Sequence, residues 1–432
     1  LRYVIGHAGI SVLFVERAKL ATLLAALRPE DAIAVIVVVD GAAEVGARAP
    51  MPCLITTLDA LIADADTAIT LDAAADATDP DDLLTIIYTS GTTGEPKGVQ
   101  LSHRNFLTAA RGIGANVGLR DGDRIISWLP HAHVAERTCS YVPALLFGLD
   151  VTFCDDAAKL PSLLPQVEPH WFGGFPRMWE RFKLRTEALL ADAIGEKPAR
   201  DLVQIAQIAE YARQQGTPVP EEVAHTVADA DARHFAPLRK ALGLSQVRML
   251  TTGSAPTPHH ILEFFAAIGL PIYDMYGASE TCTYGTMVYA GRMRIGSAGQ
   301  AAPNTEIAIA ADGEILIRGP SVMPGYLAAP AKNAEVLTDD GWYRTGDLGR
   351  IDPDGFLWVT GRKKEVMINS SGHNMAPAHI EATVKAASPL VAQVCAIGEA
   401  RPFVTALVTL DPDVTRAFAD RWGTSLPAAG WH

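Results

Sequence analysis

The sequence has few of the features that mark a secreted, membrane-spanning or nucleic-acid-binding protein. Its 432 residues include only five cysteines, and none of them forms a C-x-x-C pair, which argues against a disulfide framework or a zinc site and suits reduced thiols. Its strongest apolar run, Ala32–Val39, is much shorter than the ~20 residues that cross a bilayer. The net charge of −13 excludes the broad basic surface that nucleic-acid binding needs.

The first residues contain no basic segment followed by an apolar stretch, so we expect no signal peptide. What is present is the composition of a well-packed globular protein, with 49% hydrophobic and 20% charged residues. Short Val/Ile/Leu runs alternate with Ala- and Leu-rich stretches, which predicts an α/β fold with layered, mostly parallel sheets. The expected strands are Leu13–Val15, Ala32–Val39, Leu84–Tyr88, Asp150–Phe153, Val247–Thr251 and Pro271–Tyr273, and the expected helices include Arg17–Leu27, Phe106–Ala115 and Pro258–Ile268.

Two stretches depart from this alternation. Residues 181–242 are polar and helical in character, and we interpret them as a helical insertion. From Gly296 the sequence becomes rich in short strands and Gly/Pro turns, which predicts a β-rich subdomain over residues 296–360. We therefore expect a large N-terminal domain, residues 1–360, and a small, mobile α/β domain that begins at Gly361 and is incomplete at residue 432.

The most informative stretch is Leu83–Val99, LLTIIYTSGTTGEPKGV. An apolar strand leads into a loop rich in glycine and hydroxyl groups, where the backbone can approach a polyphosphate and donate to it. Lys97 adds a positive charge at the end of the loop. A simple glycine-rich turn is the alternative, but it does not explain so many hydroxyl side chains.

Two common nucleotide motifs are excluded. The Walker pattern fails because Pro96 stands five residues after Gly91. A dinucleotide fingerprint beginning at Gly112 fails because Val117 occupies the third glycine position and no strand precedes it.

The loop YTSGTTGEPKG resembles the phosphate loop of the acyl-adenylate-forming enzymes, the superfamily of acyl-CoA synthetases, luciferases and peptide-synthetase adenylation domains. Four further motifs follow in the family's order, so the resemblance covers nearly the whole chain and identifies residues 1–360 as an AMP-binding adenylation domain. These motifs are Tyr276–Thr281 (YGASET), Gly313–Tyr326 (GEILIRGPSVMPGY), Trp342–Gly349 (WYRTGDLG) and Gly361–Pro377 (GRKKEVMINSSGHNMAP).

The resemblance implies a role for each motif. Acyl adenylation attacks the α-phosphate of ATP with a carboxylate and expels pyrophosphate, which needs charge neutralisation and alignment. The expected catalytic residues are Lys97, Ser279, Glu280 and His133, with Ser279 at the α-phosphate and Glu280 as the Mg²⁺ ligand. The expected nucleotide- and CoA-binding residues are Thr89, Ser90, Gly91, Thr92, Thr93, Gly94, Gly253, Ser254, Ala255, Pro256, Tyr276, Gly277, Asp347, Arg362, Lys364, Ser371 and Gly372.

Within that set the resemblance assigns Tyr276 and the GSAP stretch 253–256 to the two sides of adenine, and Asp347 with Arg362 to the ribose. It makes Lys364 the hinge of the small domain, with the glycine loop at Ser371 and Gly372 presented to CoA.

Weaker signals indicate the acid. Trp128–Arg137 (WLPHAHVAER) and Phe175–Arg181 (FPRMWER) resemble segments of bacterial long-chain fatty acid–CoA ligases, in which the residue at His133 seals the acyl pocket. No aspartate that would pair a substrate amine stands near His133, which favours an aliphatic acid. The pairs His131/His133 and His259/His260 could bind a metal in principle, but no further ligand accompanies them.

The chain looks cut at both ends relative to this family. Its last lysine is Lys385, too early to be the lysine that the family carries near its C-terminus. We therefore expect a long-chain fatty acid–CoA ligase that uses ATP, Mg²⁺ and coenzyme A, with turnover impaired by the missing lysine. Two alternatives stay open: a non-catalytic ATP or acyl-adenylate binder, and an enzyme that adenylates an amino or aryl acid.

The expected partners are a long-chain fatty acid, ATP and CoA, with no nucleic acid and no transmembrane segment. The expected localisation is cytoplasmic. The resemblance leaves open a peripheral association with the inner face of the membrane, where fatty acids collect.

Overall fold

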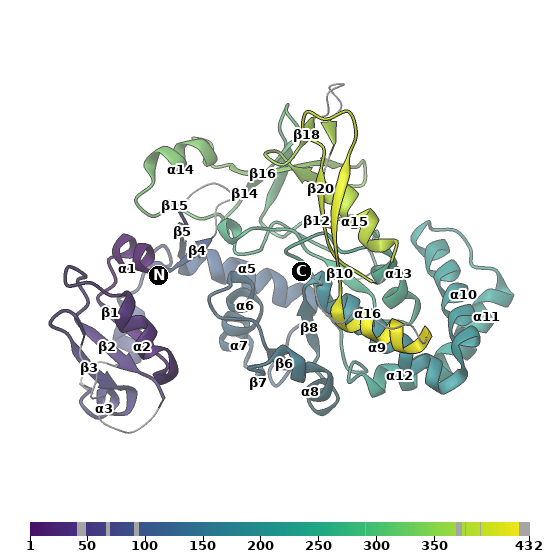
Figure 1. The fold of residues 1–432 in the computed structure, drawn as a ribbon, viewed down its shortest axis with the longest axis horizontal. Helices are drawn as coiled ribbons and strands as arrows, with labels where there is room; N and C mark the ends of the chain where they lie inside the picture. Colours follow the sequence, from purple (N-terminus) through teal and green to yellow (C-terminus); the bar gives the residue numbers. More distant parts are fainter. Residues whose placement is uncertain are drawn as a thin grey trace. The chain divides into compact units, whose positions relative to one another are not determined.

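The computed structural model describes residues 1–40, 49–65, 70–89, 95–289, 291–368, 374–375, 377–388 and 390–422 (Figure 1). It divides into two compact units, each taken by itself below. Unit 1 consists of Leu1–Phe106 and Met323–Ala334, and unit 2 consists of Leu107–Val322 and Glu335–His432.

The first part of unit 1 is a small parallel sheet covered by helices. The run predicted as a buried strand is β2, whose Ile36, Val37 and Val38 are at most 1% exposed, and it pairs in parallel with a strand on each side. Leu20 and Leu23 of the neighbouring helix pack into the same core. The elements are α1 (Arg2–Ala8), β1 (Val12–Val15), α2 (Arg17–Ala26), β2 (Val35–Val38), β3 (Leu54–Thr57), α3 (Leu58–Ala63) and α4 (Leu71–Asp76).

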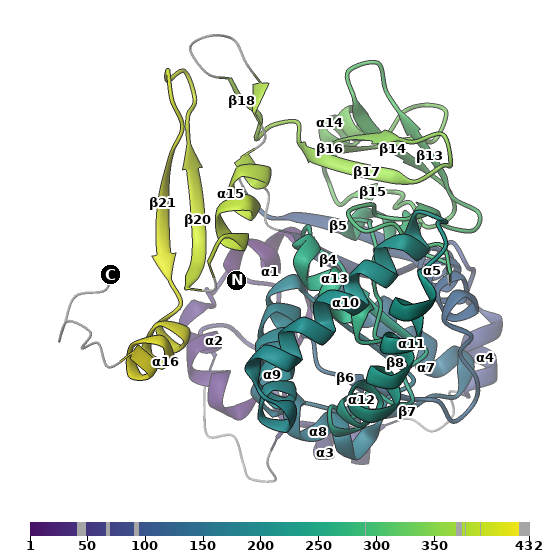
Figure 2. The ribbon, with the colours of Figure 1, turned by 90° about the vertical axis from the view of Figure 1, so that its right-hand side faces the viewer.

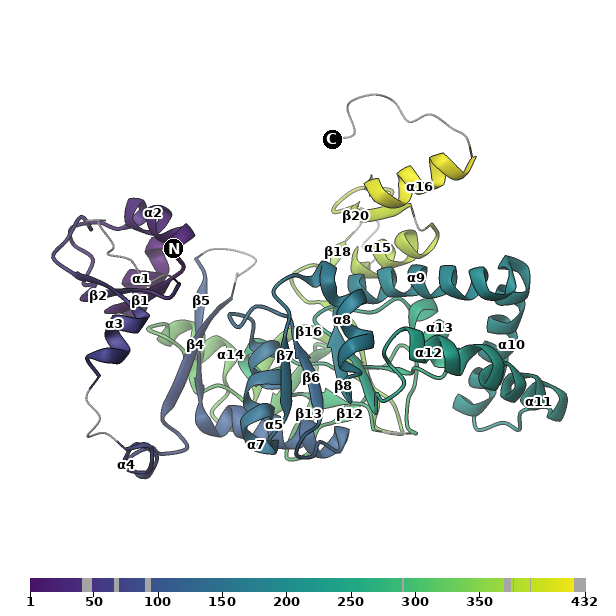
Figure 3. The same ribbon diagram turned by 90° about the horizontal axis from the view of Figure 1, so that it is seen from below.

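The second sheet of unit 1 carries the two ends of the predicted phosphate loop. β4 (Leu83–Thr89) and β5 (Lys97–Ser102) pair antiparallel (Figure 3), and the short β15 (Gly325–Tyr326) adds to the other edge of β5 (Figure 1). The sequence predicted mostly parallel sheets, and the strand expected at 84–88 departs from that pattern. Only residues 90–96 separate β4 from β5, too few for the crossover that parallel strands require.

Unit 2 begins with parallel strands joined through helices, as the alternation of the sequence predicted. β6 pairs with β7, and β8, β9 and β10 form a sheet in the order β10-β9-β8. The elements are α5 (His103–Val117, which starts in unit 1), β6 (Arg124–Ser127), α6 (Val134–Glu136), α7 (Val142–Phe147), β7 (Asp150–Phe153), α8 (Leu160–Val167), β8 (Trp171–Gly174), β9 (Met249–Thr252), α13 (His259–Ala267) and β10 (Ile272–Asp274).

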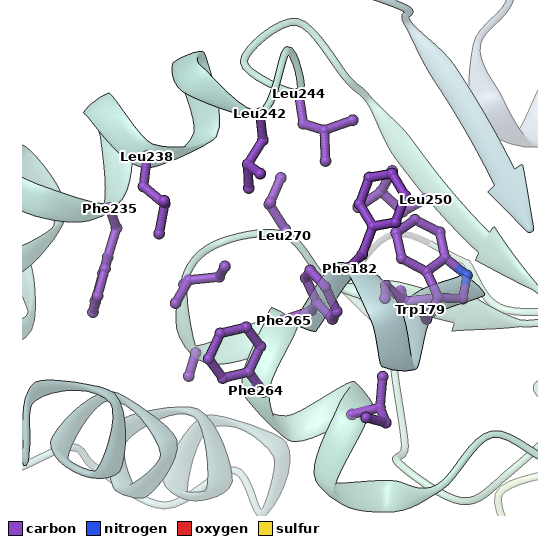
Figure 4. Packing of buried hydrophobic residues seen from close by; sticks show 14 of the residues in the cluster. Trp179, Phe182, Phe235, Leu238, Leu242, Leu244, Leu250, Phe264, Phe265 and Leu270 are labelled. Atoms are coloured by element: carbon purple, nitrogen blue, oxygen red, sulfur yellow. The ribbon is translucent and has the colours of Figure 1, made fainter. Parts of the chain in front are cut away.

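Four helices fill most of the stretch 181–242 and share one hydrophobic core with the sheet (Figure 4). Trp179 is fully buried at the centre of this core, where its ring meets the edges of Phe172 and Phe265 at centroid distances of 5.9 and 5.5 Å. Its indole Nε1 donates to the Thr251 carbonyl at 3.2 Å, which ties the helix layer to β9. The helices are α9 (Pro176–Ile194), α10 (Glu196–Gln214), α11 (Glu221–Ala230) and α12 (Ala236–Ala241).

The remainder of unit 2 is mostly antiparallel. A four-stranded sheet runs in the order β13-β14-β16-β17, and after it the chain forms a hairpin with α15 packed on its first strand (Figure 2). The α/β fold class is confirmed. The elements are β11 (Thr286–Met287), β12 (Gln300–Ala301), β13 (Glu306–Ile309), β14 (Glu314–Arg318), α14 (Pro330–Val336, shared with unit 1), β16 (Tyr343–Ile351), β17 (Leu357–Arg362), β18 (Met367–Ile368), β19 (Asn374–Met375), α15 (Pro377–Ala386), β20 (Val391–Ile397), β21 (Thr405–Leu410) and α16 (Pro412–Trp422).

Within the ranges that the structure describes, no helix combines the length and the apolar character needed to cross a membrane. All five cysteines lie in those ranges and all are free thiols, in agreement with the sequence prediction.

A group of charges lies where β6, β8 and β9 begin. Asp123 is buried and pairs with Arg248, while the Nδ1 atom of His170 accepts the backbone N–H of Arg124 at 3.0 Å. Burial lowers the pKa of His170, and the two arginines add to this effect against Asp123. The neutral imidazole therefore fits this position, because a protonated Nδ1 could not accept that hydrogen bond.

This arrangement predicts a pH dependence of stability. Between the lowered pKa of His170 and the value of ~6.5 in the unfolded chain, the unfolded state binds more protons, so the free energy of unfolding should fall as the pH drops through that range. In His170→Asn the amide oxygen replaces the Nδ1 acceptor and the titration is lost. Urea unfolding of both proteins at pH 5 to 8 checks this, and equal pH slopes would contradict it.

Candidate active site

The two ends of the phosphate loop face each other across the β4–β5 ladder. Thr89 ends β4 and is paired with Lys97, which starts β5. The loop residues Ser90, Gly91, Thr92, Thr93 and Gly94 lie outside the described residues. The Lys97 ammonium sits 5.1 Å from the centroid of the Tyr326 ring, so an aromatic face stabilises its charge at the base of the loop.

Two residues of unit 1 that contact the facing ends of β4 and β5 escaped the sequence prediction. Tyr326 is buried on β15, and Asn333 holds its backbone by accepting from its N–H at 2.7 Å and donating to its carbonyl at 3.1 Å. His7 lies with Nδ1 2.7 Å from the hydroxyl of Tyr88, the residue before Thr89. The Gly313–Tyr326 motif contained a signal for Tyr326, whereas nothing in the sequence around His7 pointed to the loop.

In unit 2 the structure brings together the residues assigned to the ribose. Asp347 on β16 is paired with Arg362 on β17, and the Arg362 Nε lies 3.2 Å from the Asp347 Oδ1. The Tyr276 hydroxyl donates to the Asp347 Oδ2 at 2.7 Å. Burial raises the pKa of Asp347, while the hydrogen bond from Tyr276 and the positive charge of Arg362 act to lower it. Each carboxylate oxygen keeps a second acceptor position, which a ligand hydroxyl can use.

The segment after Tyr276 is tightly folded. Ser279, Glu280 and Thr281 form one short helical turn, and the next two residues, Cys282 and Thr283, have positive φ angles of 52° and 59°. A Cβ at Gly277 would lie 2.3 Å from the Thr283 carbonyl carbon, so only glycine fits there. Glu280 is partly exposed, and its field contributes to the raised pKa of Asp347.

The GSAP stretch follows β9 and approaches the same segment. Gly253 lies close to the carbonyl of Met275, Ser254 has a positive φ of 70°, and Ala255 and Pro256 complete the turn. Burial raises the pKa of Asp274, at the end of β10, to about 7. The sequence prediction missed Asp274, because a single aspartate before Met275 carries no signal until its burial is known.

One cavity of unit 2, of about 100 Å³, joins these loops to the start of α9. Gly253, Ser254, Met275, Gly277 and Thr283 line one side of it. Aromatic and apolar residues line the rest, with a few polar groups among them: Ile125, Ile126, Trp128, Leu129, Ala135, Glu136, Cys139, Ser140, Trp171, Phe172, Gly173, Gly174, Phe175, Thr251 and Thr252.

His133 does not itself line this cavity but supports its wall. Its ring packs on Phe175 at a centroid distance of 5.6 Å, and its Nδ1 accepts from the Ala135 N–H at 3.1 Å, which caps α6. Burial lowers the pKa of His133, although the nearby Glu136 carboxylate opposes this. The ring is therefore neutral at pH 7, with its proton on Nε2.

The residues assigned to the small domain are only partly described. Arg362 ends β17 and Lys364 is exposed in the turn that follows, while Ser371 and Gly372 lie outside the described residues. Lys363, between them, binds Asp312 at 2.6 Å and Glu314 at 3.1 Å and so anchors the end of the strand.

No cluster of three or more metal-ligating side chains exists in the described parts of the chain, so neither histidine pair has the partners of a protein-only metal site. Glu280 offers one carboxylate, which fits a Mg²⁺ ion whose other ligands are phosphate oxygens and water.

The chain belongs to the AMP-binding enzyme family. The family's AMP-binding enzyme profile matches residues 1–327, and its profile for the AMP-binding enzyme C-terminal domain matches residues 364–422. FadD11 of Mycobacterium tuberculosis, provisionally named a fatty-acid–CoA ligase, is 41% identical over 357 residues, 82% of this chain and 62% of that protein. The long-chain-fatty-acid–CoA ligase FadD15 of Mycobacterium bovis is 37% identical over 81% of this chain and 57% of its own length.

The chain thus spans about three fifths of the length of these curated relatives. Among solved structures, the anthranilate CoA ligase AuaEII with anthranoyl-AMP matches with a TM-score of 0.68 at 20% identity, over 99% of this chain and 74% of that one. This likeness establishes the fold.

Proposed function

We propose that this chain activates a long-chain fatty acid with ATP to acyl-AMP and transfers the acyl group to coenzyme A, releasing AMP and pyrophosphate. The observation that carries the proposal is in unit 2, where the Tyr276–Asp347–Arg362 cluster and the loops after β9 and β10 belong to one framework with an apolar cavity. The fatty-acid–CoA ligase names of relatives at 37–41% identity support this acid over an amino or aryl acid.

Different residues bind and align different parts of ATP. Asp347 accepts the ribose hydroxyls, Tyr276 lies against adenine, and Ser279 donates to the α-phosphate. Mg²⁺, when bound at Glu280, neutralises phosphate charge. Thr89, Lys97 and the 90–94 loop serve the β- and γ-phosphates. Displacement at the α-phosphate needs an aligned acid carboxylate more than a proton acceptor.

We also keep the division into an adenylation domain, residues 1–360, and a small domain from Gly361 as part of this proposal. The match of a separate C-terminal profile to residues 364–422 supports it. Cytoplasmic localisation and peripheral membrane association stay predictions from the family resemblance.

ATP–pyrophosphate exchange that depends on hexadecanoate tests the proposal directly. A chain that binds ATP but catalyses no exchange, and forms no thioester from synthetic acyl-AMP and CoA, would favour the alternative of a non-catalytic binder.

Lys97→Ala is expected to weaken ATP binding about tenfold and to leave hexadecanoate binding unchanged, because one charge-assisted contact to phosphate is lost. Isothermal titration calorimetry measures both affinities. Lys19→Ala is the matched control, since Lys19 is exposed and pairs with Glu16 at 3.0 Å. An unchanged ATP dissociation constant in Lys97→Ala would refute the assignment.

Affinity for saturated acids is expected to rise with chain length, by about fourfold per methylene, because burying each CH₂ contributes ~0.8 kcal/mol. The cavity of about 100 Å³ is smaller than usual ligand pockets of ~300–1,000 Å³, so its Trp128–Phe175 wall must move to admit a long chain. Competition titrations with acids from octanoate to hexadecanoate check this. Equal affinities across the series would contradict it.

A further inference from the structure

Glu136 is a buried carboxylate that the proposed reaction does not use. It is 2% exposed and is the last residue of α6. Its Oε1 accepts from the Ser127 hydroxyl at 2.5 Å and its Oε2 from the Leu129 N–H at 3.2 Å. A buried charge is costly unless its oxygens are hydrogen-bonded, and here both oxygens are.

These hydrogen bonds close the connection between β6 and α6. Ser127 ends β6, so the Glu136 side chain joins the two ends of residues 128–135. Inside this segment the Arg137 Nε donates to the His131 carbonyl at 2.6 Å, and the His133 N–H donates to the Pro130 carbonyl at 2.8 Å. The conformation of the segment is therefore set by the two hydrogen bonds to Glu136, by Arg137 and by the segment's own His133–Pro130 bond.

The same segment carries Trp128, a ring of the cavity wall, and His133, a ring that packs behind the wall on Phe175. Trp128 and His133 both contact Phe175, at centroid distances of 6.0 and 5.6 Å, and the Trp128 Nε1 donates to the Gly173 carbonyl at 3.0 Å. Any shift of the segment would move Trp128 within the cavity and turn the Nε2–H of His133.

Glu136 also acts on the charge of His133. Burial lowers the pKa of this imidazole and the carboxylate raises it, while Phe175, packed on the ring from the start of α9, carries no charge. The carboxylate thus acts on His133 through its charge as well as through the hydrogen bonds that hold the segment.

We propose that Glu136 is a positioning residue for the acid substrate: it fixes residues 128–135 so that Trp128 lines the cavity and His133 supports Phe175 where the fatty acid binds. This inference rests on the proposed fatty-acid activation. The Glu136 side chain lines the cavity, but it takes no part in the displacement at phosphorus.

Two variants separate its hydrogen bonds from its charge. Glu136→Gln keeps an oxygen for Ser127 but turns an amide N–H toward the Leu129 N–H, so it loses one hydrogen bond and the charge. Ser127→Ala loses one hydrogen bond and keeps the charge. In both, the KM for hexadecanoate should rise about tenfold, with kcat within twofold of the wild type and the dissociation constant for ATP unchanged.

The pH profile distinguishes the two variants. Protonation of His133 is expected to set the acidic limb of kcat/KM, because it would place a charge beside the acid site. This limb should move to lower pH in Glu136→Gln and stay in place in Ser127→Ala, because only the first removes the carboxylate charge that raises the pKa of His133. A Glu136 that served only the stability of the fold would leave the KM for hexadecanoate unchanged in both variants.

Asp123→Asn is the matched control, because Asp123 is also a buried carboxylate. It stands just before the first residue of β6, whereas Glu136 binds Ser127, the last residue of β6. It should lower stability and leave the KM and the acidic limb unchanged. The inference is overturned if Glu136→Gln behaves as this control does. If Glu136→Gln does not fold, an unchanged KM in Ser127→Ala overturns it.

Tryptophan fluorescence titration with hexadecanoate, in the absence of ATP, separates this inference from the proposed function. A wild-type chain that neither binds hexadecanoate nor catalyses pyrophosphate exchange contradicts the proposed function. Wild-type binding and exchange that Glu136→Gln and Ser127→Ala reproduce unchanged contradict only the role of Glu136.

Discussion

Asp347→Ala is expected to lower the affinity for ATP by at least about a hundredfold. Both ribose hydroxyls would lose a charged acceptor, and each such hydrogen bond contributes ~1.5–3 kcal/mol. The Asp347 carboxylate is held in place, since Tyr276 binds one oxygen at 2.7 Å and Arg362 lies 3.2 Å from the other. Calorimetric titration with ATP measures the change, and hexadecanoate binding should stay at its wild-type value.

Tyr276→Phe is the control for the effect of the internal hydrogen bond. It removes the hydroxyl that binds Asp347 and keeps both the ring and the carboxylate. Its ATP affinity should fall much less than that of Asp347→Ala. Equal losses in the two variants would mean that Asp347 acts by holding Tyr276, and the ribose assignment would then be wrong.

Trp179→Ala is expected to reduce the free energy of unfolding by about 3–5 kcal/mol, the usual cost of a large cavity left by an aromatic side chain. The ring is fully buried between Phe172, Phe182 and Phe265. Urea denaturation followed by circular dichroism gives the difference.

The exposed Tyr211 on α10 provides the comparison. It is 68% exposed, and Tyr211→Ala should change the free energy of unfolding by no more than about 0.5 kcal/mol. A loss below 1 kcal/mol in Trp179→Ala would show that the core around it collapses to fill the space.

Local pattern predicted individual elements well. The strand expected at Asp150–Phe153 is β7 with those bounds, because alternation and turn residues act over a few neighbouring positions. Whether two strands pair parallel or antiparallel was harder to predict from the sequence. The strand at 84–88 joined an antiparallel sheet, since the short connection to β5 overrides the general pattern of the fold.

The candidate site could be predicted only in part. Motifs gave Tyr276, Asp347 and Arg362, but the hydrogen bond between Tyr276 and Asp347 spans 71 positions and depends on how β16 meets the loop after β10. Glu136 stood inside a quoted motif, and its importance emerged from its burial and its two hydrogen bonds. Both the Tyr276–Asp347 contact and the burial of Glu136 depend on the surroundings of the side chain in the fold, which a single sequence does not contain.

The left-handed backbone of Ser254, Cys282 and Thr283 has a consequence for engineering this protein. All three are non-glycine residues with positive φ, and Ser254 and Thr283 line the cavity. Each costs conformational energy of the order of 1 kcal/mol that glycine would relieve. A search for heat-tolerant variants should therefore select glycine at the cavity rim first. Such variants would exchange a fixed backbone at the rim for a more permissive one, so thermostability and any activity that depends on a rigid rim should evolve in opposite directions at these positions.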